Sequence, residues 1–308
     1  MAEEISHGYR WVIQNCPVCD VPPTKFVGER GGEAHRAGLG VKCEIWSCGK
    51  CGMIFPNPMP LPVGGVDQHY GMEADEFFVN HERDTKLETA RVILEDGEKM
   101  LGRKGRMLDI GAGRGEVIEV AISRGWKAEG VEPSTKFAAY AAEKTGAKIF
   151  TEPVESCGIE DSSYDLVILG AVLEHLYNPN EVVATIARIL KPGGVVFFDV
   201  PNEKGLIFTT GNLYQRARGR RWCTNLAPTF PPFHVFGYSM RPIKAMFASH
   251  GLDVVKAHVY GGFSVLPDRP GVMGKLENLG ARAFTRISNL GTLGGYIAAW
   301  AKKTQELP

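Results

Sequence analysis

Residues 109–115, Asp-Ile-Gly-Ala-Gly-Arg-Gly, combine one carboxylate with three alternating glycines. Glycines in a turn let the backbone approach a ligand where a side chain would clash. The apolar run Met107–Ile110 predicts a short buried strand before the turn, and Glu116–Arg124 predicts the helix after it. The first N–H groups of that helix have no partner within the helix. The turn therefore predicts a cofactor cradle, and its spacing argues against the Gly-x-Gly-x-x-Gly of dinucleotide sites.

A second carboxylate follows the next predicted strand, Lys127–Val131. Glu132 ends this strand, 17 residues after Gly115, which leaves room for one intervening helix. The end of the second strand is where the ribose of a nucleotide-like cofactor lies in such folds, and a carboxylate accepts hydrogen bonds from both hydroxyls. We expect that role for Glu132; the alternative is a solvated surface glutamate.

Two histidines are candidates for a general base, because an imidazole has an unperturbed pKa of ~6.5. His234 follows Thr229-Phe-Pro-Pro-Phe233, which we expect to wall the pocket, and it is the first candidate. His175 follows the apolar strand Ser163–Gly170 and is the second candidate, since ligands bind at the carboxyl edge of parallel strands. The alternatives are loop orientation by His175 and a hinge or capping role for His234.

Four cysteines have the spacing of a structural metal site. Two Cys-x-x-Cys pairs are separated by 28 residues, and the second pair is followed by glycine. Doubled pairs supply the four thiolates of a closed tetrahedral Zn²⁺ site, whereas a redox site needs one pair. We therefore expect structural zinc held by Cys16, Cys19, Cys48 and Cys51.

Arginines crowd the segment around Trp222. Arg216, Arg218, Arg220 and Arg221 lie within six positions of one another. Arginine pairs bidentately with phosphate, and an aromatic ring can stack on a sugar or base, so a phosphorylated or nucleotide-linked substrate would explain the cluster. A solvated basic loop would explain it too.

The predicted elements that position these groups alternate between strand and helix from Arg106 onward, which predicts a parallel sheet with helices on both faces. Four prolines at every second position make 53–62 a stiff extended linker. The remaining expected elements are helices at 85–101, 134–145, 180–190, 239–250 and 276–290, and strands at 148–150, 195–200, 252–258 and 295–302.

Composition limits the classes of function. The 308-residue chain has 35 basic and 35 acidic residues, so no overall field draws it to nucleic acid or to an anionic membrane. Its N-terminus lacks the features of a signal peptide, and no apolar run approaches the ~20 residues that span a bilayer. We expect a cytoplasmic protein with no membrane partner.

The motifs together resemble a class I S-adenosylmethionine (SAM) methyltransferase over about residues 100–302. They are Asp109-x-Gly-x-Gly-x-Gly115, Glu132, Tyr164-Asp165, Leu173-Glu174-His175 and Leu190-Lys-Pro-Gly-Gly194. The resemblance implies an α/β, Rossmann-like sheet of seven strands with the last antiparallel. It also implies cofactor contacts from Asp109, Gly111, Ala112, Gly113, Gly115, Glu132, Pro133, Gly170, Ala171 and His175. An adenine-contacting loop would follow the third strand, with Glu152, Glu155 or the backbone near Val154 as candidates.

The cysteine pairs, the Pro-rich segment and a following tyrosine are similar to a bacterial subgroup of sugar C- and O-methyltransferases. By this resemblance Tyr70 is a candidate catalytic residue that contacts substrate, and Arg221, Trp222, Phe233 and Tyr238 belong to the substrate region. Related sugar C-methyltransferases have Glu-His where this chain has Phe233-His234. Their acid–base pair would lack its carboxylate here.

The leading hypothesis is a SAM-dependent methyltransferase that acts on the oxygen or carbon of a small metabolite, such as a sugar or a nucleotide-linked or phosphorylated biosynthetic intermediate. The alternative is a zinc-ribbon nucleic-acid binder or RNA modifier with a methyltransferase-like domain. We expect a zinc-ribbon module at 1–60, a linker and helical cap at 61–105, a SAM-binding core at 106–203, a substrate-region insertion at 204–236, and the end of the fold at 237–308.

Overall fold

A computed structural model describes residues 4–64, 83–261, 286 and 293–304. Tyr70 and nearly all of the helix predicted at 276–290 lie outside these described residues. In the described part of the chain, no helix is both long and apolar enough to cross a membrane.

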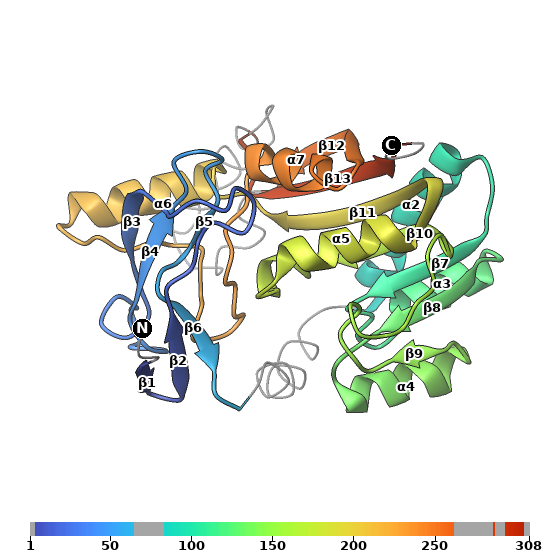
Figure 1. Ribbon diagram of the computed structural model, residues 1–308, viewed down its shortest axis with the longest axis horizontal. Coiled ribbons are helices and arrows are strands. Elements are labelled where there is room, and N and C mark those ends of the chain that lie inside the picture. Colours follow the sequence, from blue (N-terminus) through green and yellow to red (C-terminus); the bar gives the residue numbers. More distant parts are fainter. Residues whose placement is uncertain (1–3, 65–82, 262–285, 287–292, 305–308) are drawn as a thin grey trace, which may run out of the picture.

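A seven-stranded sheet forms the centre of the molecule, in the order β12-β13-β11-β10-β7-β8-β9 (Figure 1). Neighbouring strands are parallel except for β13, which pairs antiparallel with both β11 and β12. The order of the parallel strands reverses between β7 and β10, which makes that point the topological switch where ligands bind. The predicted fold class is thus confirmed. The strands are β7 Arg106–Ile110, β8 Lys127–Val131, β9 Ile149–Phe150, β10 Tyr164–Gly170, β11 Leu190–Pro201, β12 Leu252–Tyr260 and β13 Tyr296–Lys303.

Helices cover both faces of this sheet, as the alternation of strand and helix signals predicts. Ala90 and Leu94 of α2 and Ile118 of α3 belong to one buried apolar cluster on the sheet. Ile186 of α5 and Phe247 of α7 belong to another, larger cluster. The helices are α2 Arg83–Leu101, α3 Glu116–Ser123, α4 Thr135–Thr145, α5 Pro179–Ile189, α6 Leu206–Ala217 and α7 Met240–Ala248. Helix α6 lies in the insertion, where the sequence patterns predict no element.

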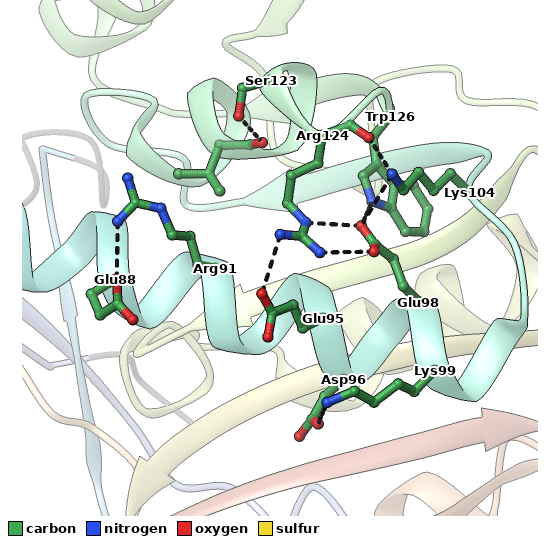
Figure 2. Close-up of polar contacts among 11 residues, drawn as sticks. Glu88, Arg91, Glu95, Asp96, Glu98, Lys99, Lys104, Ser123, Arg124 and Trp126 are labelled. Atoms are coloured by element: carbon green, nitrogen blue, oxygen red, sulfur yellow. Dashed lines mark hydrogen bonds and ion pairs between the residues drawn. The ribbon is translucent and has the colours of Figure 1, made fainter.

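A polar network fixes α2 against the end of α3. The guanidinium of Arg124 donates to both carboxylate oxygens of Glu98, at 2.9 and 2.8 Å, and Trp126 Nε1 donates to Glu98 Oε1 at 3.1 Å (Figure 2). A bidentate arginine–carboxylate pair defines orientation as well as distance. The network therefore holds α2 in place where it borders the central cavity described below.

Two three-stranded sheets build the N-terminal module (Figure 1). The Pro-rich segment predicted as a linker is extended, but it is folded into these sheets as the edge strands β5 and β6. An edge strand tolerates proline because one side of it needs no N–H donors. The first sheet holds β1 Glu4–Ser6, β2 Tyr9–Val12 and β6 Met59–Pro62, and the second holds β3 Lys25–Arg30, β4 Cys43–Ser47 and β5 Ile54–Pro56.

The module is joined to the 221–237 segment by backbone hydrogen bonds. Ile54 and Gly237 exchange bonds at 3.2 and 2.7 Å, and the N–H of Cys223 donates to the carbonyl of Glu29 at 2.9 Å. The rings of Phe55 and Phe236 lie 5.9 Å apart in the same apolar core. The N-terminal module therefore supports the segment that carries His234.

Candidate active site

A cavity of about 1230 Å³ opens at the carboxyl edge of the sheet, at the switch between β7 and β10. Typical small-molecule sites have volumes of ~300–1,000 Å³, so this cavity has room for two ligands. Most residues that the sequence assigns to the cofactor line it: Asp109, Gly111, Ala112, Gly113, Glu132, Pro133, Val154, Gly170, Ala171 and His175.

Glu132 and the glycine turn hold one another in position. Glu132 Oε2 accepts the N–H of Gly113 at 2.8 Å, and its Oε1 accepts the N–H of Ser134 at 2.9 Å. Gly111 has a φ of 76°. A Cβ at Gly111 would lie 2.5 Å from Cγ2 of Val172. A larger residue would be strained at this φ and would have to displace the Val172 side chain.

Two of the assigned cofactor residues do not line the cavity. Gly115 begins α3 at a φ of 80°, and a Cβ there would lie 3.1 Å from Cβ of Ala141, so this glycine lets α4 pack closely. Glu152 is exposed, whereas Glu155 and Val154 of the same loop line the cavity. A cofactor contact from Gly115 or Glu152 stays a prediction.

The wall of the cavity carries three buried carboxylates. Asp109, Glu116 and Glu132 are 3%, 7% and 8% exposed. Burial, followed by the charges of Glu132 and Glu116, raises the pKa of Asp109 to about 8. Burial also raises the pKa of Glu132. A cation bound beside these carboxyl groups would favour their ionised form and pair with it, whereas a pyrophosphate would find no positive partner in this wall. These residues therefore fit SAM, which has a sulfonium, an ammonium and ribose hydroxyls, and fit a dinucleotide poorly.

The two candidate histidines lie together with a carboxylate. One nitrogen of each ring and one oxygen of Glu174 lie within 4.8 Å of one another. The ring centroids of His175 and His234 are 4.9 Å apart, and His234 Nε2 lies 4.0 Å from Glu174 Oε1. His175 lines the cavity, whereas His234 is not among the lining residues and lies against the His175 ring.

Burial keeps both imidazoles neutral near pH 7. It lowers the pKa of His175 to about 4, and burial together with the nearby His175 lowers the pKa of His234 to about 3. His175 hydrogen-bonds to the backbone at Phe233 and Pro232, and proline can only accept there. The ring nitrogen that donates carries the hydrogen, and the other nitrogen, Nδ1, is a buried atom and the basic one.

Asp199 and Tyr260 are site residues that the sequence patterns do not indicate. Asp199 Oδ1 accepts the N–H of Ala171 at 2.9 Å, and the Tyr260 hydroxyl donates to Asp199 Oδ2 at 3.4 Å. Ala171 has the left-handed φ of 52°, a strained value for a non-glycine residue. The strands that carry Asp199 and Tyr260 meet through β13, a long-range pairing that no local motif reveals.

A methyltransferase-domain family matches residues 79–257, which is more than half of the 308-residue chain. The chain belongs to this methyltransferase family. A SAM-dependent methyltransferase from Archaeoglobus fulgidus shares the fold: the TM-score is 0.51 at 18% identity, over 72% of this chain and 95% of that one.

Two curated relatives carry the name ubiquinone biosynthesis O-methyltransferase. The protein of Bordetella avium (strain 197N) is 37% identical over 104 residues, which are 32% of this chain and 43% of that protein. The protein of Aliivibrio fischeri (strain MJ11) is 34% identical over 120 residues, 36% of this chain and 49% of that protein. The chain thus matches less than half the length of either relative.

The four substrate-region residues lie outside the cavity lining of the methyltransferase domain. Arg221 and its neighbours Arg216 and Arg220 line a separate groove of about 400 Å³ against β3. The backbone of Trp222 forms an isolated parallel β-bridge with that of Glu29. Tyr238 is buried, and its hydroxyl donates to the Leu173 carbonyl at 3.1 Å. Phe233 has a φ of 54° beside His234. Substrate contacts by Arg221, Trp222, Phe233 and Tyr238 stay predictions.

The four N-terminal cysteines converge as their spacing predicts. Their sulfurs lie within 4.8 Å of one another, with Cys16 Sγ and Cys51 Sγ at 3.5 Å. Tetrahedral zinc with Zn–S bonds of ~2.3 Å places sulfurs ~3.8 Å apart. Each pair closes a tight turn. The N–H of Asp20 donates to the carbonyl of Cys16 at 2.9 Å, and the N–H of Gly52 donates to the carbonyl of Cys48 at 2.9 Å. The set of four thiols fits a closed zinc site.

Burial of Asp109 is expected to lower the stability of the methyltransferase domain while the side chain strengthens cofactor binding. Its folded pKa of about 8 exceeds the ordinary 3.8, so folding takes up a proton between these pH values and stability falls as pH rises through them. We expect Asp109→Asn to raise the unfolding temperature at pH 8, with a gain that shrinks toward pH 4, and to weaken S-adenosylhomocysteine binding by about tenfold or more. Calorimetry at a series of pH values measures both effects. A lower unfolding temperature at pH 8 would contradict this reasoning.

Proposed function

We propose that this chain transfers the methyl group of SAM to a hydroxyl oxygen of a small metabolite. The observation that carries the proposal is the cavity at the strand switch, which has a carboxylate wall for a cationic cofactor and a neutral imidazole for a proton. The names of the relatives support oxygen as the acceptor. We keep a sugar or a related hydroxylated ring as the acceptor class, as the sequence resemblance implies.

The turn at Gly111–Gly113 and the carboxylates of Asp109 and Glu132 would hold the cofactor. Glu132 would orient the ribose while it fixes the Gly113 N–H. Asp109 has a raised pKa, and a bound cation would lower that pKa so that the ionised carboxylate offsets the positive charge. When bound, SAM supplies a methyl group made electrophilic by its sulfonium. The protein must hold the acceptor oxygen in line with that methyl group and exclude water.

Aromatic side chains in the lining of the cavity suit a ring-shaped acceptor. Tyr260 of β12, Trp300 of β13 and Tyr177 all line it. The rings of Tyr260 and Tyr296 stack at 5.7 Å, which fixes the position of Tyr260. Flat aromatic faces stack on sugar rings and phenols while leaving hydroxyls free to react.

The His175–His234 pair would take the proton from the acceptor. The sequence ranks His234 first, but His175 is the ring that borders the cavity, so we propose that His175 accepts the proton and that His234 supports it. Its lowered pKa leaves His175 unprotonated at pH 7, which is the form that a base needs.

We expect His175→Ala to lower kcat by about 100-fold, because general-base catalysis contributes ~10²–10⁴ in rate, with S-adenosylhomocysteine affinity within about threefold of wild type. The assay follows tritium from methyl-labelled SAM into a panel of phenols and sugars. His250→Ala is the matched control, since His250 bonds to Asn180 at 2.9 Å outside the cavity. Undiminished turnover by His175→Ala would remove the base from the proposal.

We also propose that Cys16, Cys19, Cys48 and Cys51 hold one structural Zn²⁺. A site closed by four thiolates has no open position for a reacting ligand, so its contribution is to stability. Its place in the fold suggests that it steadies the 221–237 segment, to which the N-terminal sheets are bonded.

A further inference from the structure

Glu174 is a buried carboxyl group without an ordinary partner. It is 2% exposed, and within the described ranges its Oε2 has no hydrogen-bond partner. The ring nitrogen Nε2 of His234 lies 4.0 Å from its Oε1. No hydrogen bond at Oε2 offsets the free-energy cost of burying this carboxyl group, so packing alone does not explain a glutamate at this position.

The backbone of Glu174 has a separate role from its side chain. Its carbonyl accepts the N–H groups of Val235 at 2.8 Å and Phe236 at 3.3 Å, which ties the His234 segment to the 3-10 turn Leu173–His175. A glutamine at 174 would keep these backbone bonds and the shape of the side chain. It would remove only the charge.

We infer that the Glu174 carboxylate is the counter-charge of the His175–His234 pair, stabilising the imidazolium that forms when the acceptor hydroxyl gives up its proton. This inference rests on the proposed function. In the step, the acceptor O–H bond would break as its proton goes to the basic nitrogen of His175, and an oxygen lone pair would form the bond to the methyl carbon. The methyl–sulfur bond would break at the same time, and its electron pair would go to the sulfur, so that S-adenosylhomocysteine is the leaving group. The positive charge on the imidazole pair then faces the negative charge of Glu174.

The surroundings of Glu174 determine when it carries that charge. The titratable groups around it are His175, His234, Asp199, Tyr238, Tyr260 and Tyr296, with no lysine or arginine paired to it in the described part of the chain. Burial raises the pKa of Glu174 to about 8. The carboxyl is therefore protonated at pH 7 and ionised above pH 8, so wild-type turnover should rise with pH through this range.

The test is Glu174→Gln, measured for turnover with tritiated SAM and phenol or sugar acceptors from pH 6 to 9. We expect kcat to fall by about 50-fold at pH 9, the rise with pH to disappear, and S-adenosylhomocysteine affinity to change by less than about threefold. Because a buried charge is removed, the unfolding temperature at pH 9 should increase. Glu174→Asp should restore part of the rise with pH.

Glu203→Gln is the matched control. Glu203 is also buried, its pKa is raised to about 7 by burial, and it bonds to Asn225 rather than to a histidine. Its substitution should leave the pH profile of turnover intact. An unchanged profile in Glu174→Gln, or a fall in its unfolding temperature at pH 9, would overturn the inference.

The main alternative is that Glu174, His175 and His234 hold a metal ion. Measuring the number of metal ions bound per chain distinguishes this alternative from the inference. We expect one zinc per chain, equal in wild type and Glu174→Gln. A second metal equivalent that Glu174→Gln loses would overturn the inference. The two proposals fail differently: wild type that transfers no methyl group contradicts the function, and Glu174→Gln that transfers it normally contradicts the inference.

Discussion

Replacement of Glu132 with alanine is expected to weaken S-adenosylhomocysteine binding by about 100-fold or more, equivalent to ~2.7 kcal/mol. The carboxylate fixes the N–H groups of Gly113 and Ser134 at 2.8 and 2.9 Å, so its loss frees the turn that approaches the cofactor. The same change removes the proposed acceptor of the ribose hydroxyls. Titration calorimetry measures the affinity directly, and circular dichroism checks that the sheet remains folded.

Glu143→Ala is the control for this prediction. Glu143 is an exposed acid on the neighbouring helix α4, and its loss should leave the affinity within about twofold of wild type. If Glu132→Ala bound S-adenosylhomocysteine as tightly as wild type, the cofactor would have to lie away from the end of β8.

Cys48→Ser is expected to abolish stoichiometric zinc and to lower the unfolding temperature by roughly 10 °C, since structural zinc contributes many kcal/mol and ~1 kcal/mol shifts a domain of this size by ~2–4 °C. The cysteines belong to the same apolar cluster as Phe55 and Phe236, so the loss should spread to the 221–237 segment. Methyl transfer should fall by about tenfold or more. S-adenosylhomocysteine affinity should be retained, because the residues proposed to hold the cofactor lie at the ends of β7 and β8 in the central sheet and not in the N-terminal module.

Cys157→Ser is the control, because Cys157 lies outside the cluster of four. It should retain zinc, and it should shift the unfolding temperature by less than about 2 °C. Zinc content and differential scanning calorimetry provide both readouts. Full zinc occupancy in Cys48→Ser would contradict the four-cysteine assignment.

Local sequence patterns predict much of the cofactor side of this site. The glycine turn follows β7, Glu132 follows β8 and Ala171 follows β10. Because the carboxyl ends of these parallel strands meet at one edge of the sheet, the order of elements along the chain is enough to bring the three together. The four cysteines are equally local, because each pair needs only its own turn. In these cases the backbone element and the functional side chain belong to the same short segment.

The acceptor side depends on contacts between distant segments, and there the sequence patterns are less informative. Asp199 and Tyr260 meet through pairing with β13, and Glu174 reaches His234 across 60 positions of chain. The Pro-rich stretch 53–62 predicts a linker because proline excludes helix. Its participation in two sheet edges depends on partners elsewhere in the chain.

Titration calorimetry of the purified wild-type chain with S-adenosylhomocysteine and, separately, with NAD measures directly whether the cavity is a site for the methyl donor SAM. The carboxylate wall predicts saturable one-to-one binding of S-adenosylhomocysteine and no measurable heat from NAD. Tight binding of NAD with none of S-adenosylhomocysteine would contradict the account.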